Sequence, residues 1–255
     1  MTRQIKNIIA ITAFLICIGL INFAGQNIDI QIRGINAFTF ILIVAVLLQI
    51  IFFIPSFLLK TEKYYDLVGS LTYVTTVSLA YFAVENKTMI DSIIYFYVMV
   101  WASRLGIYLF RRVRNDGKDV RFEKAKRHFF WFLQYWMGQA LWVTLTACAA
   151  IIAILSPEDD TLPVLAIFGM ALWLSGFTIE SISDYQKRVF RKENNPSESF
   201  IHTGLWARSR HPNYFGEVTL WTGIAVIALN TLTGIEYITL ISPVFVYILL
   251  TRMSG

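Results

Sequence analysis

Residues 207–217, ARSRHPNYFGE, gather polar and charged side chains where an apolar segment of the chain is about to begin. Pro212 suits the first turn of a helix, because its fixed φ and missing N–H cost nothing at that position. Ser209 or His211 would then cap the helix. The segment therefore predicts a helix start that carries reactive side chains at the mouth of an apolar span.

Asn213, Gly216 and Glu217 share one face of this predicted helix, since they are spaced i, i+3 and i+4. Free N–H groups at the helix start, with Arg208 and Arg210 beside them, favour a phosphate or carboxylate. Gly216 would let another group approach the backbone closely. A charged Glu217 costs roughly 2.5–3.5 kcal/mol at mid-bilayer and less near the surface. The pattern indicates a ligand site, whereas a basic anchor on lipid phosphates would explain the arginines alone.

The preceding stretch ESISDYQKRVFRK keeps helical spacing and places its charges on one broad face: Glu180, Asp184, Lys187, Arg188 and Arg191. Carboxylates deep in the span and cations further out suit a polar anionic ligand at the headgroup level. A helix end with salt bridges and snorkelling side chains would show the same pattern.

Other polar positions are less specific. Arg104 lies six residues before the end of its apolar span and either snorkels or reaches a bound anion. KTEKYYD (60–66) suits interfacial residues that include proton donors, and RNDGKDVRFEKAK suits a solvated loop. Cys17 and Cys148 lie in apolar runs, against a disulfide framework. The three histidines lack metal-ligand spacing, and GxGxxG is absent, so we expect no metal site and no Rossmann unit.

Membrane helices must position these residues. Of 255 residues 56% are hydrophobic and 15% charged, and the mean hydropathy is +0.57, which favours a polytopic membrane protein with no nucleic-acid partner. Unpaired backbone groups are not tolerated in lipid and no barrel pattern is present, so the spans should be helices. Segments of suitable length occupy 7–24, 36–59, 67–84, 91–110, 129–155, 162–182, 216–230 and 235–251. The last two are short and could form a hairpin, so we predict an all-α bundle of seven to eight transmembrane helices in one membrane domain, 1–255.

The basic residues predict the orientation of this bundle. Nineteen lysines and arginines lie in the N-terminal segment, in alternate connections and at the C-terminal end, against two, Arg33 and Lys87, in the other connections. The first apolar stretch is long for a signal-peptide core, so we interpret it as a retained span. We therefore expect a multi-pass protein of the cell membrane with a cytoplasmic N-terminus and a site that faces the cytoplasm.

Four segments, TEKYYDLVGSLTY, WASRLGIYLFRRVRNDGKD, DYQKRVFRKE and HTGLWARSRHPNYFGE, carry a resemblance over roughly residues 40–255. They look like the bacterial DUF1295 branch of the steroid 5α-reductase family. Its members are polytopic enzymes that hold NADPH in a cytoplasm-facing cavity among the last helices and reduce a carbon–carbon double bond in a lipophilic substrate. The resemblance implies that residues 160–255 carry the cofactor region, and relatives usually continue beyond the segment that matches LLTRMSG.

The resemblance matches Asn213, Glu217, Asp184, Arg191 and Arg104 to cofactor-pocket residues of the family. Together with their neighbours, the predicted NADPH-binding residues are Arg104, Asp184, Lys187, Arg191, His202, Trp206, Ser209, Arg210, His211, Asn213, Tyr214 and Glu217. The predicted catalytic residues, of which the first three are chosen by location as proton donors, are Tyr65, Asp66, Tyr73 and Glu217.

The chain departs from the steroid-reducing members at three positions. Phe52 and Phe53 stand where those members carry a Gln-Glu pair, and Trp101 stands where they carry a carbonyl-polarising tyrosine. These departures argue against the steroid enone that those members reduce, and the expected substrate is a lipid-, isoprenoid- or sterol-like alkene. The same RHPxYxG cadence occurs in membrane methyltransferases that use S-adenosylmethionine to modify isoprenylcysteine or phospholipids. That activity is the first alternative, and a non-enzymatic lipid-binding protein is the second.

Overall fold

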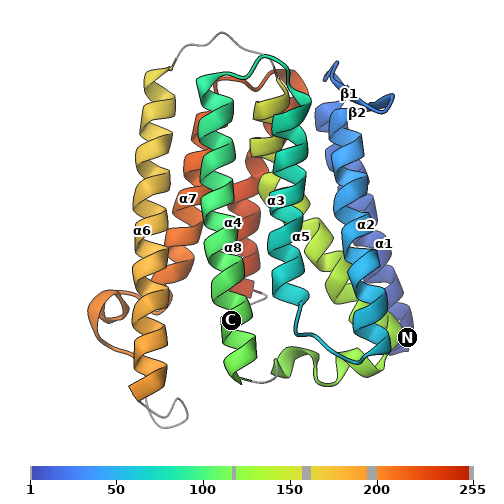
Figure 1. Cartoon of the computed structure of the whole chain (residues 1–255), viewed down its shortest axis with the longest axis vertical. Coiled ribbons are helices and arrows are strands. Elements are labelled where there is room, and N and C mark those ends of the chain that lie inside the picture. The colour runs from blue at the N-terminus through green and yellow to red at the C-terminus, as the bar shows by residue number, and fades with distance from the viewer. Residues whose placement is uncertain (1, 117–118, 157–161, 194–199, 253–255) are drawn as a thin grey trace. The chain divides into compact units, whose positions relative to one another are not determined.

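The computed structural model describes residues 2–116, 119–156, 162–193 and 200–252 (Figure 1). These residues form eight α-helices: α1 (Arg3–Ile21), α2 (Ala37–Leu58), α3 (Tyr65–Ala83), α4 (Met89–Asp116), α5 (Phe129–Leu155), α6 (Val164–Glu193), α7 (Pro212–Ala228) and α8 (Ile241–Arg252). By length and apolar composition six of them could cross a membrane: α1, α2, α4, α5, α6 and α8, the last with the 3-10 helix that precedes it. The predicted all-α membrane bundle is confirmed.

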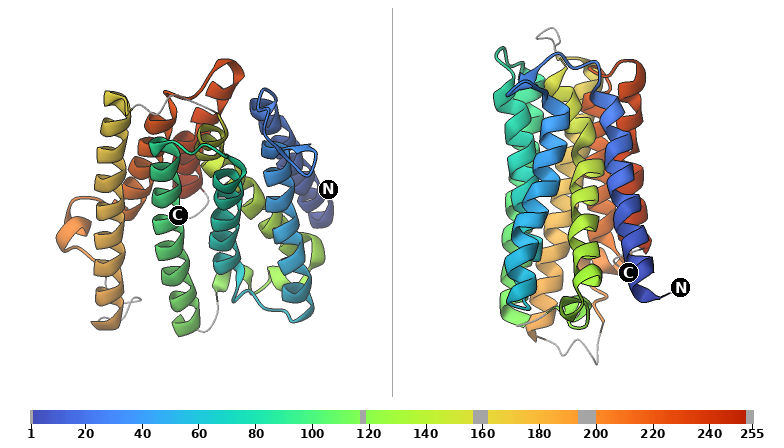
Figure 2. Two further views of the ribbon diagram at one scale, coloured as in Figure 1. Left: turned by 45° about the horizontal axis from the view of Figure 1, so that its top comes forward. Right: turned by 90° about the vertical axis from the view of Figure 1, so that its right-hand side faces the viewer.

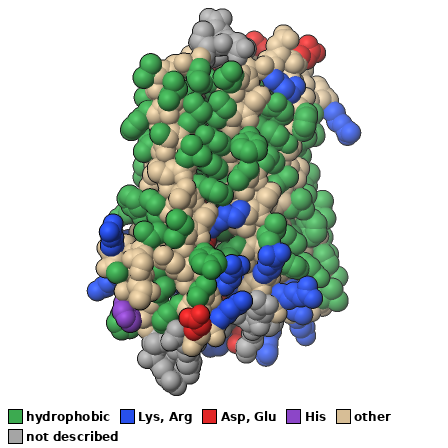
Figure 3. All heavy atoms as spheres, turned by 60° about the vertical axis from the view of Figure 1, so that its left-hand side comes forward, with side chains coloured by type: hydrophobic (Ala, Val, Ile, Leu, Met, Phe, Trp, Pro, Cys, Tyr) green, Lys and Arg blue, Asp and Glu red, His purple; other side chains and the backbone are tan. Residues whose placement is uncertain are grey.

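The helices divide into two compact units. The first unit comprises residues 1–160 and 231–239, and the second comprises 161–230 and 240–255. In the first unit α5 packs against each of α1, α2, α3 and α4 (Figure 2). The window of α5 that could span a membrane is 83% buried, whereas that of α1 is 22% buried. Helix α5 is therefore the core of this unit, and the helices around it expose apolar side chains. Apolar side chains also cover much of the face seen in Figure 3.

Polar side chains are buried within the first unit. The amide Nε2 of Gln49 on α2 donates to Oγ1 of Thr72 on α3 at 2.8 Å, and Thr72 donates to the Val68 carbonyl at 2.7 Å. Within the described ranges, Oε1 of Gln49 and Oε1 of Gln139 are buried without a hydrogen-bond partner. Because a polar contact in an apolar interior is satisfied in one register only, this chain of bonds helps to fix α2 against α3.

A short hairpin joins α1 to α2 and was not predicted from the sequence. Its strands β1 (Gln31–Ile32) and β2 (Ile35–Asn36) pair antiparallel around a two-residue turn. Both turn residues, Arg33 and Gly34, have positive φ (52° and 77°), as a type I′ turn requires. Asn36 then begins α2: its side-chain oxygen accepts from the Thr39 N–H at 3.1 Å, and its Nδ2 donates to the Gly25 and Ile28 carbonyls.

Helices α6 and α7 of the second unit pack through glycines spaced seven residues apart on each helix. Gly169 and Gly176 of α6 face Gly223 and Gly216 of α7 so closely that an added Cβ at any of them would lie 2.5–2.7 Å from an atom of the other helix. Only glycine permits such an approach of two backbones. This glycine seam places the polar end of α6 directly against the start of α7.

Candidate functional site

Three carboxylates are buried where the glycine seam reaches the polar ends of α6 and α7. Glu180 is 2% exposed, Asp184 is 6% exposed and Glu217 is 8% exposed. Glu180 belongs to the seam itself, because a Cβ on Gly216 would lie 2.6 Å from the Glu180 amide nitrogen. Their burial agrees with the predicted arrangement of deep carboxylates, and Arg188 and Arg191 lie exposed towards the end of α6. Ionised groups this buried need compensating partners or a ligand.

The segment that leads into α7 folds back onto α6. A 3-10 helix, η4 (Gly204–Ala207), is fixed by two bonds: the Trp206 indole donates to the Ser183 carbonyl at 3.1 Å, and the Leu205 N–H donates to Gln186 Oε1 at 3.1 Å. The Lys187 ammonium lies 5.1 Å from the centre of the Trp206 ring. Two predicted cofactor residues from different segments are therefore in contact, and η4 forms a wall along the polar part of α6.

Helix α7 begins at Pro212, as predicted, with His211 at the N-cap position. The capping prediction is wrong, because the structure shows no side-chain cap bond from His211, and Ser209 Oγ instead accepts from the His211 backbone N–H at 3.2 Å. The His211 ring stacks on the Tyr214 ring, with 4.7 Å between centroids and 8° between planes. The His211 side chain therefore does not cap α7, and the start of a helix favours an anion.

Asn213 lies in this first turn with its amide oxygen buried. Among the described residues, Oδ1 of Asn213 has no hydrogen-bond partner. A buried acceptor without a donor costs about 1–3 kcal/mol, so Oδ1 of Asn213 can accept from an N–H or O–H group of a ligand. His202, Ser209 and Arg210 lie nearby in sequence and are exposed.

The second unit thus contains eleven of the twelve predicted cofactor residues, which lie on the end of α6, in the segment 202–211 that includes η4, and at the start of α7. Arg104 lies on α4 of the first unit. The predicted proton donors Tyr65, Asp66 and Tyr73 lie on α3 of the same unit. Tyr65 is buried, and its hydroxyl donates to the Tyr135 carbonyl at 2.9 Å. Its proton is thereby committed to a structural bond.

Asp66 lies in the first turn of α3, ahead of the apolar stretch of that helix, and pairs with two arginines. Its carboxylate is 3.4 Å from Arg112 and 3.7 Å from Arg121. Burial raises the pKa of Asp66, and the charges of Arg121 and Arg112 offset only part of that effect. A carboxyl group with a raised pKa is more readily protonated near neutral pH than an ordinary aspartate, which keeps Asp66 among the candidate proton donors.

Sequence reasoning missed a network of ion pairs between KTEKYYD and the loop after α4. Glu62 is 4% exposed, binds the Lys126 ammonium at 2.7 Å and accepts from the Asp119 N–H at 3.2 Å. Asp119 accepts from Arg121 Nε at 3.0 Å. Burial acts to raise the pKa of Asp119, but the hydrogen bond and charge of Arg121 outweigh it and the pKa is lowered. The mixed charges of this loop suggested a solvated loop, but its described part pairs with buried Glu62.

The buried carboxylates do not form a metal centre. Across the residues that the structure describes, no three His, Cys, Asp or Glu side chains are grouped so that they could hold a metal ion. The acidic groups of the second unit are better suited to hydrogen bonding with N–H donors or to pairing with an organic cation.

Comparisons with known proteins place the chain in a family. No curated protein and no solved structure matches the sequence. Residues 52–255, which include α3 to α8, match the model of the family described as "Protein of unknown function (DUF1295)". Because this match covers most of the chain, the protein belongs to the DUF1295 family.

Proposed function

We propose that the protein is a membrane-embedded reductase that uses NADPH to reduce a carbon–carbon double bond in a lipophilic, sterol-, isoprenoid- or lipid-like substrate. The cofactor would bind from the cytoplasmic side of the cell membrane at the end of α6 and the start of α7. The observation that carries the proposal is the buried, unpartnered Oδ1 of Asn213, one turn from the buried carboxylate of Glu217.

The residues present fit the chemical groups of NADPH. A carboxamide or amino group donates N–H bonds, which Oδ1 of Asn213 and the carboxylate of Glu217 can accept. Phosphates are held by cations and by backbone N–H groups at helix starts, which Arg208, Arg210 and the first turn of α7 can supply. Recognition of the amide end and of the phosphates is thus available within one helix start.

The remaining predicted residues have supporting roles in this proposal. The His211 ring stacks on the Tyr214 ring at the start of α7, and the Lys187 ammonium lies over the Trp206 ring beside the end of α6. When bound, NADPH supplies a hydride, and the protein must then deliver a proton to the substrate. Tyr65, Asp66 and Tyr73, which were chosen by location, stay the predicted proton donors.

Ligand-dependent thermal stabilisation of purified protein in a neutral detergent tests the proposal. NADPH should raise the melting temperature, and S-adenosylmethionine should not. Asn213→Ala removes one neutral acceptor, so NADPH affinity should fall roughly 2- to 12-fold, while Glu217→Ala removes a charged acceptor and should weaken it roughly 10- to 100-fold. The control is Thr219→Ala on the same helix, whose hydroxyl donates to the Phe215 carbonyl of its own helix. Unchanged NADPH affinity in both Asn213 and Glu217 variants would refute the site.

The three buried carboxylates favour one second candidate. S-adenosylmethionine carries a sulfonium and an ammonium group, and buried carboxylates stabilise cations. Stabilisation by S-adenosylmethionine but not by NADPH would therefore assign a membrane methyltransferase. Stabilisation by neither would favour a non-enzymatic lipid-binding protein.

A further inference from the structure

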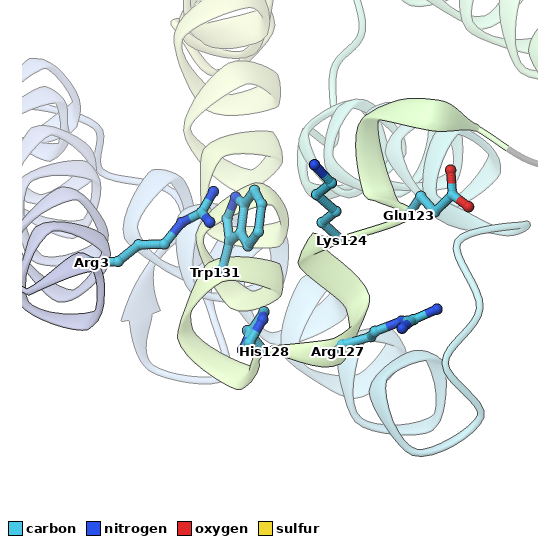
Figure 4. A pocket seen from close by; sticks show the side chains of 6 residues that line it. All are labelled: Arg3, Glu123, Lys124, Arg127, His128 and Trp131. Carbon is cyan, nitrogen blue, oxygen red and sulfur yellow. The ribbon is translucent and has the colours of Figure 1, made fainter.

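A basic pocket of about 370 Å³ lies in the first unit, where α1 and α5 both begin (Figure 4). Its lining residues come from the first turn of α1, the loop before α5 and the first turn of α5: Arg3, Glu123, Lys124, Arg127, His128 and Trp131. Three of these side chains are permanent cations and one is a carboxylate, so the pocket carries net positive charge before His128 is counted. A volume of this size accommodates a small organic ion.

The cations are arranged around an aromatic platform. The Arg3 guanidinium carbon lies 3.2 Å from the centre of the Trp131 ring, and the His128 ring is stacked 6.0 Å from it. Figure 4 shows Arg3 against the face of Trp131 and Lys124 on the other side of the indole. Stacking on tryptophan holds a guanidinium in place while leaving its N–H groups free to donate. Arg3 and Lys124 therefore flank the indole from opposite sides, and both can donate to an anionic group at this pocket.

The pocket lies at the level where lipid headgroups meet water. Arg3 begins one candidate membrane span, Arg3–Gly25, and Phe129 begins another, Phe129–Leu155. Apolar side chains are exposed on the first two turns of these helices: Ile5, Ile8, Ile9, Phe129 and Phe130. Tryptophan and arginine at the end of an apolar helix are typical of the membrane interface. A ligand with an anionic head and acyl tails would contact both surfaces at once.

We propose that this pocket binds the phosphate headgroup of an anionic phospholipid, with the acyl chains lying along α1. The pocket shares no residue with the proposed cofactor site, which belongs to the second unit. The lipid proposal can therefore be tested independently of the reductase proposal. A zwitterionic lipid would bring an ammonium group among the cations and should bind more weakly.

Titration of purified protein in a neutral detergent tests the assignment, with dioctanoyl-phosphatidylglycerol as the probe and the melting temperature as the readout. Dioctanoyl-phosphatidylcholine tests the charge, and glycerol 3-phosphate tests whether a soluble phosphate suffices. Arg3→Ala with Lys124→Ala removes two cations, and at about 5-fold for each cation the affinity should fall at least 10-fold. Lys63→Ala with Arg111→Ala removes two exposed cations outside the pocket and should change the affinity by less than about 3-fold.

Lys124→Glu provides a second test, because Lys124 is exposed and its reversal leaves the buried core intact. This variant should keep the wild-type melting temperature without lipid and lose the response to phosphatidylglycerol. Equal losses in the pocket and control double variants would overturn the site. Equal binding of phosphatidylcholine, or equal binding of glycerol 3-phosphate, would overturn the anionic-lipid assignment.

Discussion

The glycine seam makes a sharp prediction for Gly176 of α6. In Gly176→Ala the added Cβ would lie 2.5 Å from the Leu220 amide nitrogen and 2.6 Å from the Gly216 carbonyl oxygen. Both atoms are backbone atoms of α7, so no side chain can rotate to relieve the clash. Ordinary carbon contacts begin near 3.5 Å, so α6 must move roughly 1 Å away from α7.

The expected cost is about 1–3 kcal/mol, the usual range for overpacking a close-packed site. Alanine also favours a helix by about 1 kcal/mol over glycine, which would mask part of this cost. Gly19 in α1 provides the control, because an added Cβ there meets nothing within 4 Å. Both variants gain the same helix propensity, so the difference between them isolates the strain in the glycine seam.

Thermal unfolding in one neutral detergent measures that difference. At about 2–4 °C per kcal/mol for a chain of this size, Gly176→Ala should melt roughly 2–12 °C below Gly19→Ala. Because α6 and α7 carry the proposed cofactor residues, NADPH affinity should also fall in Gly176→Ala and not in the control. Identical melting temperatures for the two variants would show that α6 and α7 are not packed through their glycines.

Three further substitutions test the first unit. Tyr65→Phe removes the hydrogen bond to the Tyr135 carbonyl and should lower the free energy of unfolding by about 0.5–1.5 kcal/mol. The proposed reductase activity per folded molecule should not change. Loss of activity without loss of stability would instead indicate that Tyr65 is a proton donor. Asp119→Asn should destabilise by at most about 1 kcal/mol at pH 7, because Arg121 is partly exposed. Folding lowers the pKa of Asp119, so the stability that Asp119 contributes is complete above its unfolded-state pKa and is lost as the pH falls through its folded-state pKa. The wild type and Asp119→Asn should therefore have the same stability in strong acid. A difference that persists there would contradict the pairing with Arg121. Gln49→Leu removes Oε1, a buried acceptor without a partner among the described residues, together with the hydrogen bond to Thr72. These two effects oppose each other, so urea or thermal unfolding should show a stability within about 1 kcal/mol of the wild type. A loss above about 3 kcal/mol would refute this account.

The helices were predictable because apolar runs in a membrane protein report helix position directly. Each predicted span overlaps one observed helix, and the helical spacing of ESISDYQKRVFRK correctly indicated that α6 continues to Glu193. The start of α7 was also predictable from local sequence, because proline is disfavoured at every position of a helix except the first turn.

Contacts between distant segments were not predictable from local patterns. Glu62 and Lys126 are 64 residues apart, and neither residue type indicates which partner it will meet. The side-chain cap of α7 was predicted wrongly for a related reason. The Ser209 hydroxyl accepts from the His211 N–H, two residues further along the chain, instead of from the first turn of α7. Short polar side chains commonly form such local turn bonds.

Gly216 shows a local inference whose partner could not be identified from the sequence. The sequence indicated only that another group approaches this glycine closely. The structure places the α6 backbone there, so that a Cβ added to Gly216 would lie 2.6 Å from the Glu180 nitrogen. The consequence favours a site nonetheless, because the same close packing buries Glu180 and Glu217 near the start of α7. Asn213 lies one turn closer to that start than Glu217, so a ligand that approaches from this end meets Asn213 first, and its unpartnered oxygen is the atom on which the functional proposal depends.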